Sequence, residues 1–222
     1  MLLKLAVAAV VETIYAIITR AGLPHALSGI PLELAITACR AAAAVVFWLL
    51  FRDLIAAKQR TSASLRDPLA AAGILVFLSV PIITGDNRMD DVGLMVVYAL
   101  TSVVVAIKEE ILYRGALQNL IKRRFGRFLA LFISNIVFIL YHYGTRAFTP
   151  RIVAGYFVAG CVMGLVYDAT GTLASSIMMH AVYDALWPFT PLLPYVWTGW
   201  TGIWLLVLSM ALLVAWDRRE WN

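Results

Sequence analysis

Eight apolar blocks divide the 222-residue chain, and they constrain its fold more than any other feature. Such blocks are typical of bilayer-spanning helices, which need about 20 mainly apolar residues each. The composition agrees, since only 14% of the residues are charged, against about a quarter in soluble domains. The sequence therefore predicts an all-α polytopic membrane protein. The expected spans are roughly Leu5–Ile18, Leu32–Phe51, Leu69–Thr84, Val92–Leu117, Phe128–His142, Ile152–Tyr167, Leu173–Trp187 and Val196–Trp216.

The chain is expected to form a single transmembrane domain over residues 1–222. The longest loop between spans on the predicted cytoplasmic side, Arg52–Asp67, is too short to hold a soluble domain. The two cysteines, Cys39 and Cys161, exclude a disulfide framework and a cysteine-based zinc site. The net charge of +5 arises from basic residues in short loops, so we expect membrane lipids, and no nucleic acid, as partners.

The distribution of Lys and Arg between the two sides predicts the orientation of the helices. Cytoplasmic loops carry an excess of these residues. With eight spans, four basic residues fall on one side: Arg20, Arg88, Arg146 and Arg151. Eleven fall on the other side: Lys4, Arg52, Lys58, Arg60, Arg66, Lys122, Arg123, Arg124, Arg127, Arg218 and Arg219. Both termini are therefore predicted to be cytoplasmic.

Ionisable side chains inside the spans are the candidates for function, because they are costly in hydrocarbon and usually face a bundle interior or a cavity. Among the early spans, we interpret Glu12, Glu33 and Arg40 as one interhelical ion-pair group. The densest cluster begins with Lys108, Glu109 and Glu110. On a helix, Glu110 shares a face with Arg114 four residues later and can pair with it. Glu109 is turned from Glu110 by about 100° and remains available for chemistry.

Two histidines lie in later spans, each with a partner four residues away on the same helix face. His142 follows Phe138, and His180 precedes Asp184. Taken singly, each histidine is better explained as a packing residue that forms an interhelical hydrogen bond. However, a rise of about 1.5 Å per residue places Glu109, His142, His180 and Asp184 at similar depths, about 14–21 Å from the cytoplasmic boundary. We therefore expect them to line a polar intramembrane cavity.

Three motifs in this order resemble the CPBP (ABI) family of intramembrane glutamic endopeptidases, which includes the type II CAAX prenyl proteases. They are Glu109-Glu110-x-x-x-Arg114, Phe138-x-x-x-His142 and His180-x-x-x-Asp184. The resemblance covers about Lys108–Trp187, and the motif-bearing core spans about 93–188. It implies about eight helices around a cavity open to the cytoplasm, and peptide hydrolysis without a covalent intermediate.

The resemblance also implies a role for each residue. Glu109 would be the general base and, with His142, would hold the attacking water. His180 and Asp184 would stabilise the oxyanion, and Glu110, Arg114 and Phe138 would support them. Many members have Asn where this chain has Asp184, and an ionised carboxylate would repel an oxyanion. Three alternatives remain open: a protonated Asp184, an Asp184 that orients His180, or a divalent metal such as zinc bound by Glu109, His142, His180 and Asp184. We favour a site without a metal.

The leading hypothesis is an intramembrane endopeptidase that removes a C-terminal CAAX-type tripeptide or processes a precursor or leader. Its partner would be a peptide or protein, including lipid-modified ones. The Ala- and Arg-rich composition is compatible with a bacterial inner membrane. Two rival hypotheses use the same residues differently. One is a transporter or ion-conducting protein with a proton relay, and the other is a non-catalytic membrane scaffold with polar interhelical contacts.

Overall fold

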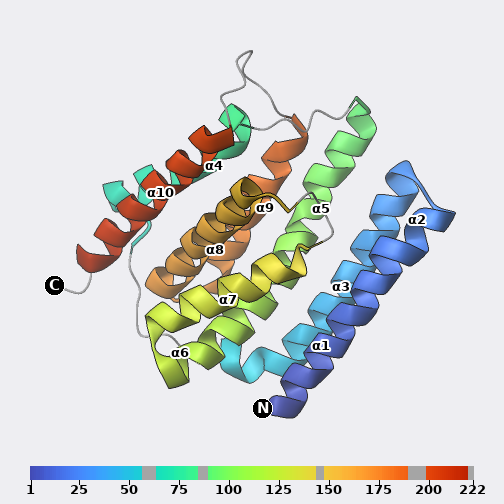
Figure 1. The fold of residues 1–222 in the computed structure, drawn as a ribbon, viewed down its shortest axis with the longest axis horizontal. Coiled ribbons are helices and arrows are strands. Elements are labelled where there is room, and N and C mark those ends of the chain that lie inside the picture. Colours follow the sequence, from blue (N-terminus) through green and yellow to red (C-terminus); the bar gives the residue numbers. More distant parts are fainter. Residues whose placement is uncertain (57–63, 85–89, 144–147, 190–198, 220–222) are drawn as a thin grey trace.

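The computed structural model describes residues 1–56, 64–84, 90–143, 148–189 and 199–219, and all of its regular elements are helices in these ranges. Figure 1 shows the helices side by side in one bundle. The elements are α1 (Leu2–Ile17), η1 (Ile18–Gly22), α2 (Leu23–Ala26), α3 (Gly29–Ile55), α4 (Pro68–Thr84), α5 (Val92–Glu110), η2 (Ile111–Gln118), α6 (Asn119–Phe125), α7 (Arg127–Tyr141), α8 (Pro150–Thr170), α9 (Leu173–Leu186), η3 (Trp187–Phe189) and α10 (Gly199–Arg219).

The predicted all-α membrane fold is confirmed, because each expected span has a helical counterpart. Within the described ranges, five helical stretches are long and apolar enough to cross a membrane. They are Leu2–Ala26, Gly29–Ile55, Val92–Phe125, Pro150–Thr170 and Trp200–Asp217. The helices α4 and α7 are apolar but shorter, with 17 and 15 residues. Shorter spans fit a membrane that is locally thinned around a bundle.

Two boundaries differ clearly from the prediction. The fourth span does not end at Leu117, since the helix continues without a break to Phe125. The first span continues through a π-helical turn to Ala26 instead of ending near Ile18. The predicted start of the eighth span at Val196, and the loop residues Lys58, Arg60, Arg88 and Arg146, lie outside the described residues.

Local signals explain where the helices of the motif region begin and end. The side chains of Asp91, Thr149 and Thr172 accept hydrogen bonds from backbone N–H groups in the first turns of α5, α8 and α9, as N-cap residues do. Gly171 ends α8 in the left-handed conformation, with φ 66°, which glycine adopts without a steric penalty. The α8–α9 turn is therefore short, and it sets the two helices side by side.

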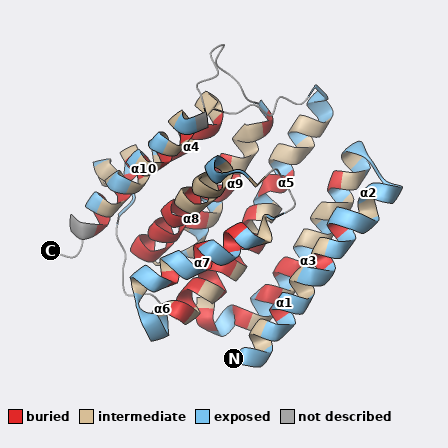
Figure 2. Cartoon of the chain, viewed as in Figure 1, coloured by how far each residue is buried: buried red, intermediate tan, exposed pale blue. Residues whose placement is uncertain are grey.

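Two apolar clusters form the interior. One joins α4, α8, α9 and α10 around Phe77, Val162 and Trp216. The other joins α1, α3 and η2 around Phe47 and Phe51. Figure 2 shows buried residues concentrated on α8 and along the continuous helix from α5 to α6, whereas α1 is largely exposed. The helix that carries the Glu109-Glu110 motif thus lies between the two clusters.

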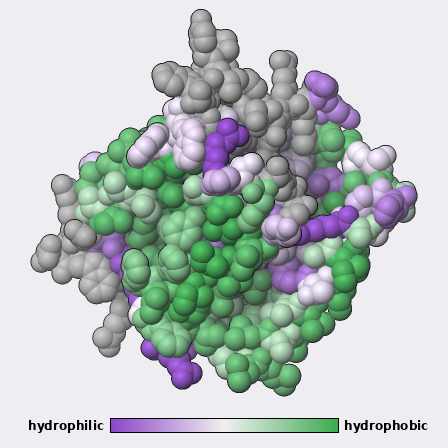
Figure 3. All heavy atoms as spheres, viewed as in Figure 1, coloured by the Kyte–Doolittle hydropathy of each residue, from purple (hydrophilic) through white to green (hydrophobic). Residues whose placement is uncertain are grey.

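The surface has the distribution expected of a membrane protein. In the view of Figure 3, hydrophobic residues cover most of the face and hydrophilic residues gather toward its ends. Figure 1 shows the start of α1 and the end of α10 at the end of the bundle that also holds α6. This placement is what an even number of crossings requires.

Candidate active site

The two adjacent glutamates lie at the end of α5, where the backbone changes from α-helical to π-helical at Ile111. Short π-helical segments inside helices are rare and frequently occur at functional sites. Both glutamates are buried, and Glu110 has no exposed surface. Two neighbouring carboxylates in such a place each need compensation, because an isolated buried charge is very costly.

Glu110 is compensated by two basic groups. Arg114 Nη1 lies 3.3 Å from Glu110 Oε1, which is the pair expected from their four-residue spacing. His180 Nδ1 lies 2.8 Å from the same oxygen and donates a hydrogen bond to it. Sequence reasoning did not identify this second contact, because no spacing rule relates residues that lie 70 positions apart. Glu110 therefore joins α5 to α9 as well as to Arg114.

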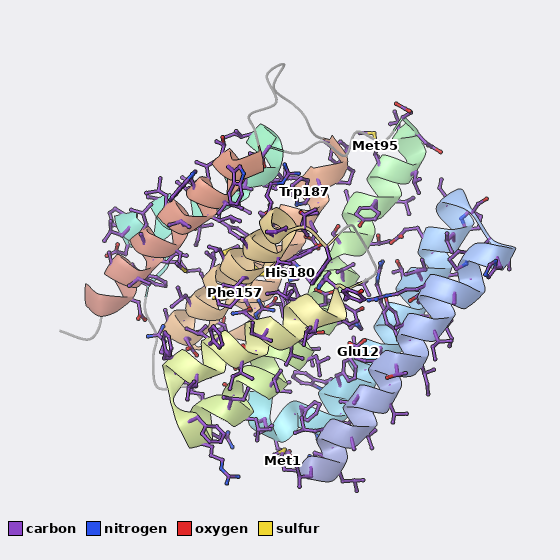
Figure 4. All side chains as sticks on the ribbon, in the orientation of Figure 1. Met1, Glu12, Met95, Phe157, His180 and Trp187 are labelled. Carbon is purple, nitrogen blue, oxygen red and sulfur yellow. The ribbon has the colours of Figure 1, made fainter. Side chains whose placement is uncertain are left out.

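His180 brings the remaining carboxylates together with its second ring nitrogen. Its Nε2 lies 3.3 Å from Asp184 Oδ2 and 3.8 Å from Glu109 Oε2. In the described part of the chain, His180 is the only basic side chain within 4.0 Å of the Glu109 carboxylate. The structure thus brings Glu109, Glu110, His180 and Asp184 into one cluster. Figure 4 shows His180 in the middle of the bundle.

The cluster opens toward Asp184. The side-chain exposure is 27% for Asp184, 7% for Glu109 and 0% for Glu110. Asp184 is therefore the most exposed carboxylate of the cluster, and Glu110 is fully buried. This order of exposure separates the two glutamates: Glu110 has the environment of a supporting residue, and Glu109 lies nearer to solvent.

His142 lies just beyond the last residue of α7, and its contacts run to aromatic neighbours. Its ring stacks on Tyr156 at a centroid distance of 4.6 Å and packs against Phe138 at 4.5 Å. His142 Nδ1 lies 2.8 Å from the Phe138 carbonyl oxygen, so Nδ1 carries the hydrogen and a neutral ring has its lone pair on Nε2. The Arg114 guanidinium in turn lies over the Phe138 ring, 5.0 Å from the ring centroid. His142 is therefore connected to the carboxylate cluster through Phe138 and Arg114.

The expected ion-pair group of Glu12, Glu33 and Arg40 is wrong as a single group. Arg40 Nη1 does pair with Glu33, at 2.7 Å, but both residues belong to α3. Glu12 pairs instead with Lys108 of α5, at 2.5 Å. Partner choice between helices depends on how their faces meet, which spacing along one helix does not determine. Lys108, the residue before Glu109, is thereby held by the N-terminal helix.

A series of polar contacts fixes the motif helix to α8. Arg114 Nη2 donates to the Gly160 carbonyl at 3.0 Å, and Gln118 Nε2 donates to the Gly164 carbonyl at 3.1 Å. One turn further, Lys122 pairs with Asp168 at 2.9 Å. Each step is four residues on both helices, so the two helices run parallel with matching spacing. Asp168 also pairs with Arg127 at the start of α7.

One alternative from the sequence is a divalent metal bound by Glu109, His142, His180 and Asp184. Among the described residues, no group of three or more His, Cys, Asp and Glu side chains is placed to hold a metal ion. His180 Nδ1 is bonded to Glu110, and the His142 ring packs against Phe138 and Tyr156. The choice between a metal-bound and a metal-free site therefore stays a prediction.

Comparison with known proteins identifies the region that holds the three motifs. Residues 91–186 match the family described as type II CAAX prenyl endopeptidase Rce1-like. No curated protein and no solved structure matches the chain. The resemblance to CAAX-type proteases that the motifs indicated is thereby confirmed.

Proposed function

We propose that this membrane protein is an intramembrane endopeptidase in which Glu109 activates a water molecule, because residues 91–186 match the Rce1-like family of type II CAAX prenyl endopeptidases. The observation that carries the proposal is the difference between the adjacent glutamates. Glu110 is fully buried and bonded to Arg114 and His180. Glu109 lies 3.8 Å from His180 on the more exposed side of the cluster, where it can accept a proton from water.

In this mechanism Glu109 takes a proton from water, and the resulting hydroxide attacks the carbonyl carbon of the scissile peptide bond. The lone pair on His142 Nε2 accepts a hydrogen bond from the same water and orients it. The protonated Glu109 then returns its proton to the leaving amine as the C–N bond breaks. The immediate products are a carboxylic acid and an amine, and transfer of the acid proton to the amine then gives a carboxylate and an ammonium group. No covalent enzyme intermediate and no metal ion take part in the proposed mechanism.

His180 stabilises the negative charge that develops on the carbonyl oxygen. In its doubly protonated form His180 donates through both ring nitrogens. Its Nδ1–H donates to Glu110, which fixes the orientation of the ring, and its Nε2–H faces Glu109 and Asp184. A preorganised donor at such a position is the usual means of stabilising an oxyanion. We assign to Asp184 the orientation of this ring through Nε2 in the resting state, a contact that the substrate carbonyl replaces.

The substrate is a protein or peptide, as the protease family implies. We propose that it reaches the site from the cytoplasm and carries a C-terminal CAAX-type sequence or a leader to be removed, with or without a lipid. The site would then lie in a bacterial inner membrane, with both termini cytoplasmic. A transporter or a scaffold has no corresponding support from the comparison.

The test is cleavage by purified protein in detergent of a farnesylated peptide that ends in a CAAX sequence, alongside the same peptide without the lipid, with products identified by mass spectrometry. Glu109→Gln should lower the rate about 10²–10⁴-fold, the usual contribution of a general base. Asp53→Asn is the control, since Asp53 is an exposed carboxylate at the end of α3 and its removal leaves the buried carboxylates unchanged. Cleavage at the wild-type rate by Glu109→Gln would refute the mechanism.

A further inference from the structure

The N-terminal helical stretch Leu2–Ala26 lies outside the matched region 91–186. Most of its surface is exposed (Figure 2), and its main helical neighbour is α3. Three of its polar side chains nevertheless reach the motif helices: Glu12, Tyr15 and Arg20. Figure 4 shows Glu12 on the side of the bundle occupied by α1. Ionisable side chains are costly in hydrocarbon and often mark functional positions. Their contacts from a mostly exposed helix therefore indicate a role for that helix in the site.

Glu12 and Tyr15 hold Lys108, the residue that precedes Glu109. Lys108 Nζ pairs with Glu12 Oε1 at 2.5 Å and lies 4.3 Å from the centroid of the Tyr15 ring. Lys108 is only 1% exposed. Its ammonium group therefore depends on these contacts, because water does not surround it as it would a surface ion pair. Their effect is to fix α5 at the position immediately before the proposed base.

Arg20 holds the end of α7 on both sides of His142. Its Nη2 donates to the Tyr141 carbonyl at 2.7 Å, and its Nη1 donates to the Tyr143 carbonyl at 3.0 Å. The last carbonyl groups of a helix have no partner within the helix, and an arginine fork can satisfy two of them at once. Because Tyr141 and Tyr143 are the two neighbours of His142, this fork restrains both the position and the rotation of the His142 backbone.

A direct contact joins these two points. Lys108 Nζ lies 3.0 Å from the Tyr141 hydroxyl and 4.4 Å from the centroid of the same ring. The guanidinium of Arg20 also lies over the Tyr141 ring, 5.0 Å from its centroid. The residues immediately before Glu109 and His142 are therefore in contact with each other, and α1 together with η1 holds both of them.

We propose that the N-terminal helix is a positioning element of the active site, in which Arg20 is the positioning residue that sets His142 relative to Glu109. The inference rests on the proposed role of His142 in holding the attacking water. Arg20 touches neither water nor substrate and acts only through the backbone beside His142. An error of about 1 Å in the placement of such a group costs up to about 100-fold in rate.

The experiment compares Arg20→Ala, Arg20→Lys and the control Arg123→Ala, which removes an exposed arginine from α6. Arg20→Ala should lower kcat about 10–100-fold with little change in KM. Thermal stability should change little, since exposed polar contacts contribute little to folding. Arg20→Lys should recover only part of the rate, because an ammonium group lacks the planar fork. Arg123→Ala should match the wild type.

A second measurement does not depend on activity. The chain has three histidines, so nitrogen-15 histidine spectra can be assigned by single substitutions. Arg20→Ala should shift or broaden the His142 signals and leave those of His180 in place. Unchanged kcat together with an unchanged His142 signal would overturn the inference, as would a rate loss explained by KM alone. If the wild type cleaves neither peptide, the proposed function fails, and the His142 signal then decides the positioning role by itself.

Discussion

Replacement of Arg114 by methionine is expected to destabilise the protein strongly. The variant removes a buried guanidinium that lies 3.3 Å from Glu110 and donates to the Gly160 carbonyl at 3.0 Å. Glu110 and Arg114 are 0% and 1% exposed, so water cannot replace the lost partner. Removing one member of a buried ion pair costs about 3–5 kcal/mol, because the other charge is left uncompensated.

The expected change in Tm follows from the size of the chain. For 150–250 residues, about 1 kcal/mol corresponds to about 2–4 °C, so Arg114→Met should lower Tm by roughly 6–20 °C. The assay is thermal unfolding in detergent, followed by intrinsic fluorescence, together with the yield of monodisperse protein. Arg123→Met is the control. It removes an exposed arginine and should change stability by about 0.5 kcal/mol or less.

A double variant separates loss of charge compensation from simple loss of packing. In Glu110→Gln with Arg114→Met, both charges of this buried pair are gone, and the glutamine carbonyl can still accept a hydrogen bond from His180 Nδ1. The double variant should therefore recover more than half of the lost Tm. A single Arg114→Met variant as stable as the wild type would refute the reasoning, and so would a double variant no more stable than the single one.

Three further outcomes are expected. Gly164→Ala should destabilise the protein by about 1–3 kcal/mol in thermal unfolding. A Cβ at this position would lie 2.6 Å from Leu131 Cδ2 and 2.8 Å from Gln118 Oε1. Gly155→Ala is the control on the same helix, because a Cβ there meets nothing within 4 Å, and it should be neutral or slightly stabilising. Asp184→Asn should cleave peptide at least as fast as the wild type if the carboxylate only orients His180, and a loss of more than tenfold would contradict that role. Reporter domains fused to either terminus should both be found on the cytoplasmic side by protease protection, and a single protected terminus would show the charge count to be misleading.

The helical architecture was predictable because its signals are local in the sequence. Apolar block length indicates a span, and polar residues such as Glu109 or His180 within a block indicate an interior face. The pairing of Glu110 with Arg114 follows from the pitch of one helix. Each of these features depends on residues within a few turns of each other, so no knowledge of the packing was needed.

The end of the motif helix was not predictable from hydropathy. Arg114, Gln118 and Lys122 dilute the apolar signal, so the block was expected to end at Leu117. The structure continues the helix to Phe125 because partners on α8 satisfy these side chains. A Cβ at 160 would meet Asn135 of α7, and a Cβ at 164 would meet Leu131 of α7 and Gln118 of the motif helix. The spacing of these two small residues is therefore a signal in the sequence that indicates close helix packing.

Contacts between distant segments were also missed, for a different reason. The sequence predicts for Arg20 only a place in a loop between spans, but its guanidinium donates to two backbone carbonyls at the end of α7. Backbone acceptors leave no trace in the sequence of the partner. The predicted partner of Glu12 lay in the neighbouring early span. Its observed partner, Lys108, lies 96 residues later in the chain.

The different roles of the adjacent glutamates follow from the direction in which three consecutive residues leave one helix. Successive side chains are turned by about 100°, so Lys108 and Glu110 point to different neighbours. Lys108 meets Glu12 and Tyr141, on α1 and α7, and Glu110 meets Arg114 and His180. Glu109 leaves the helix between these two anchored directions, where His180 lies 3.8 Å away. Anchoring both neighbours holds the middle carboxylate in place without a strong ion pair of its own, which is the condition that a general base requires.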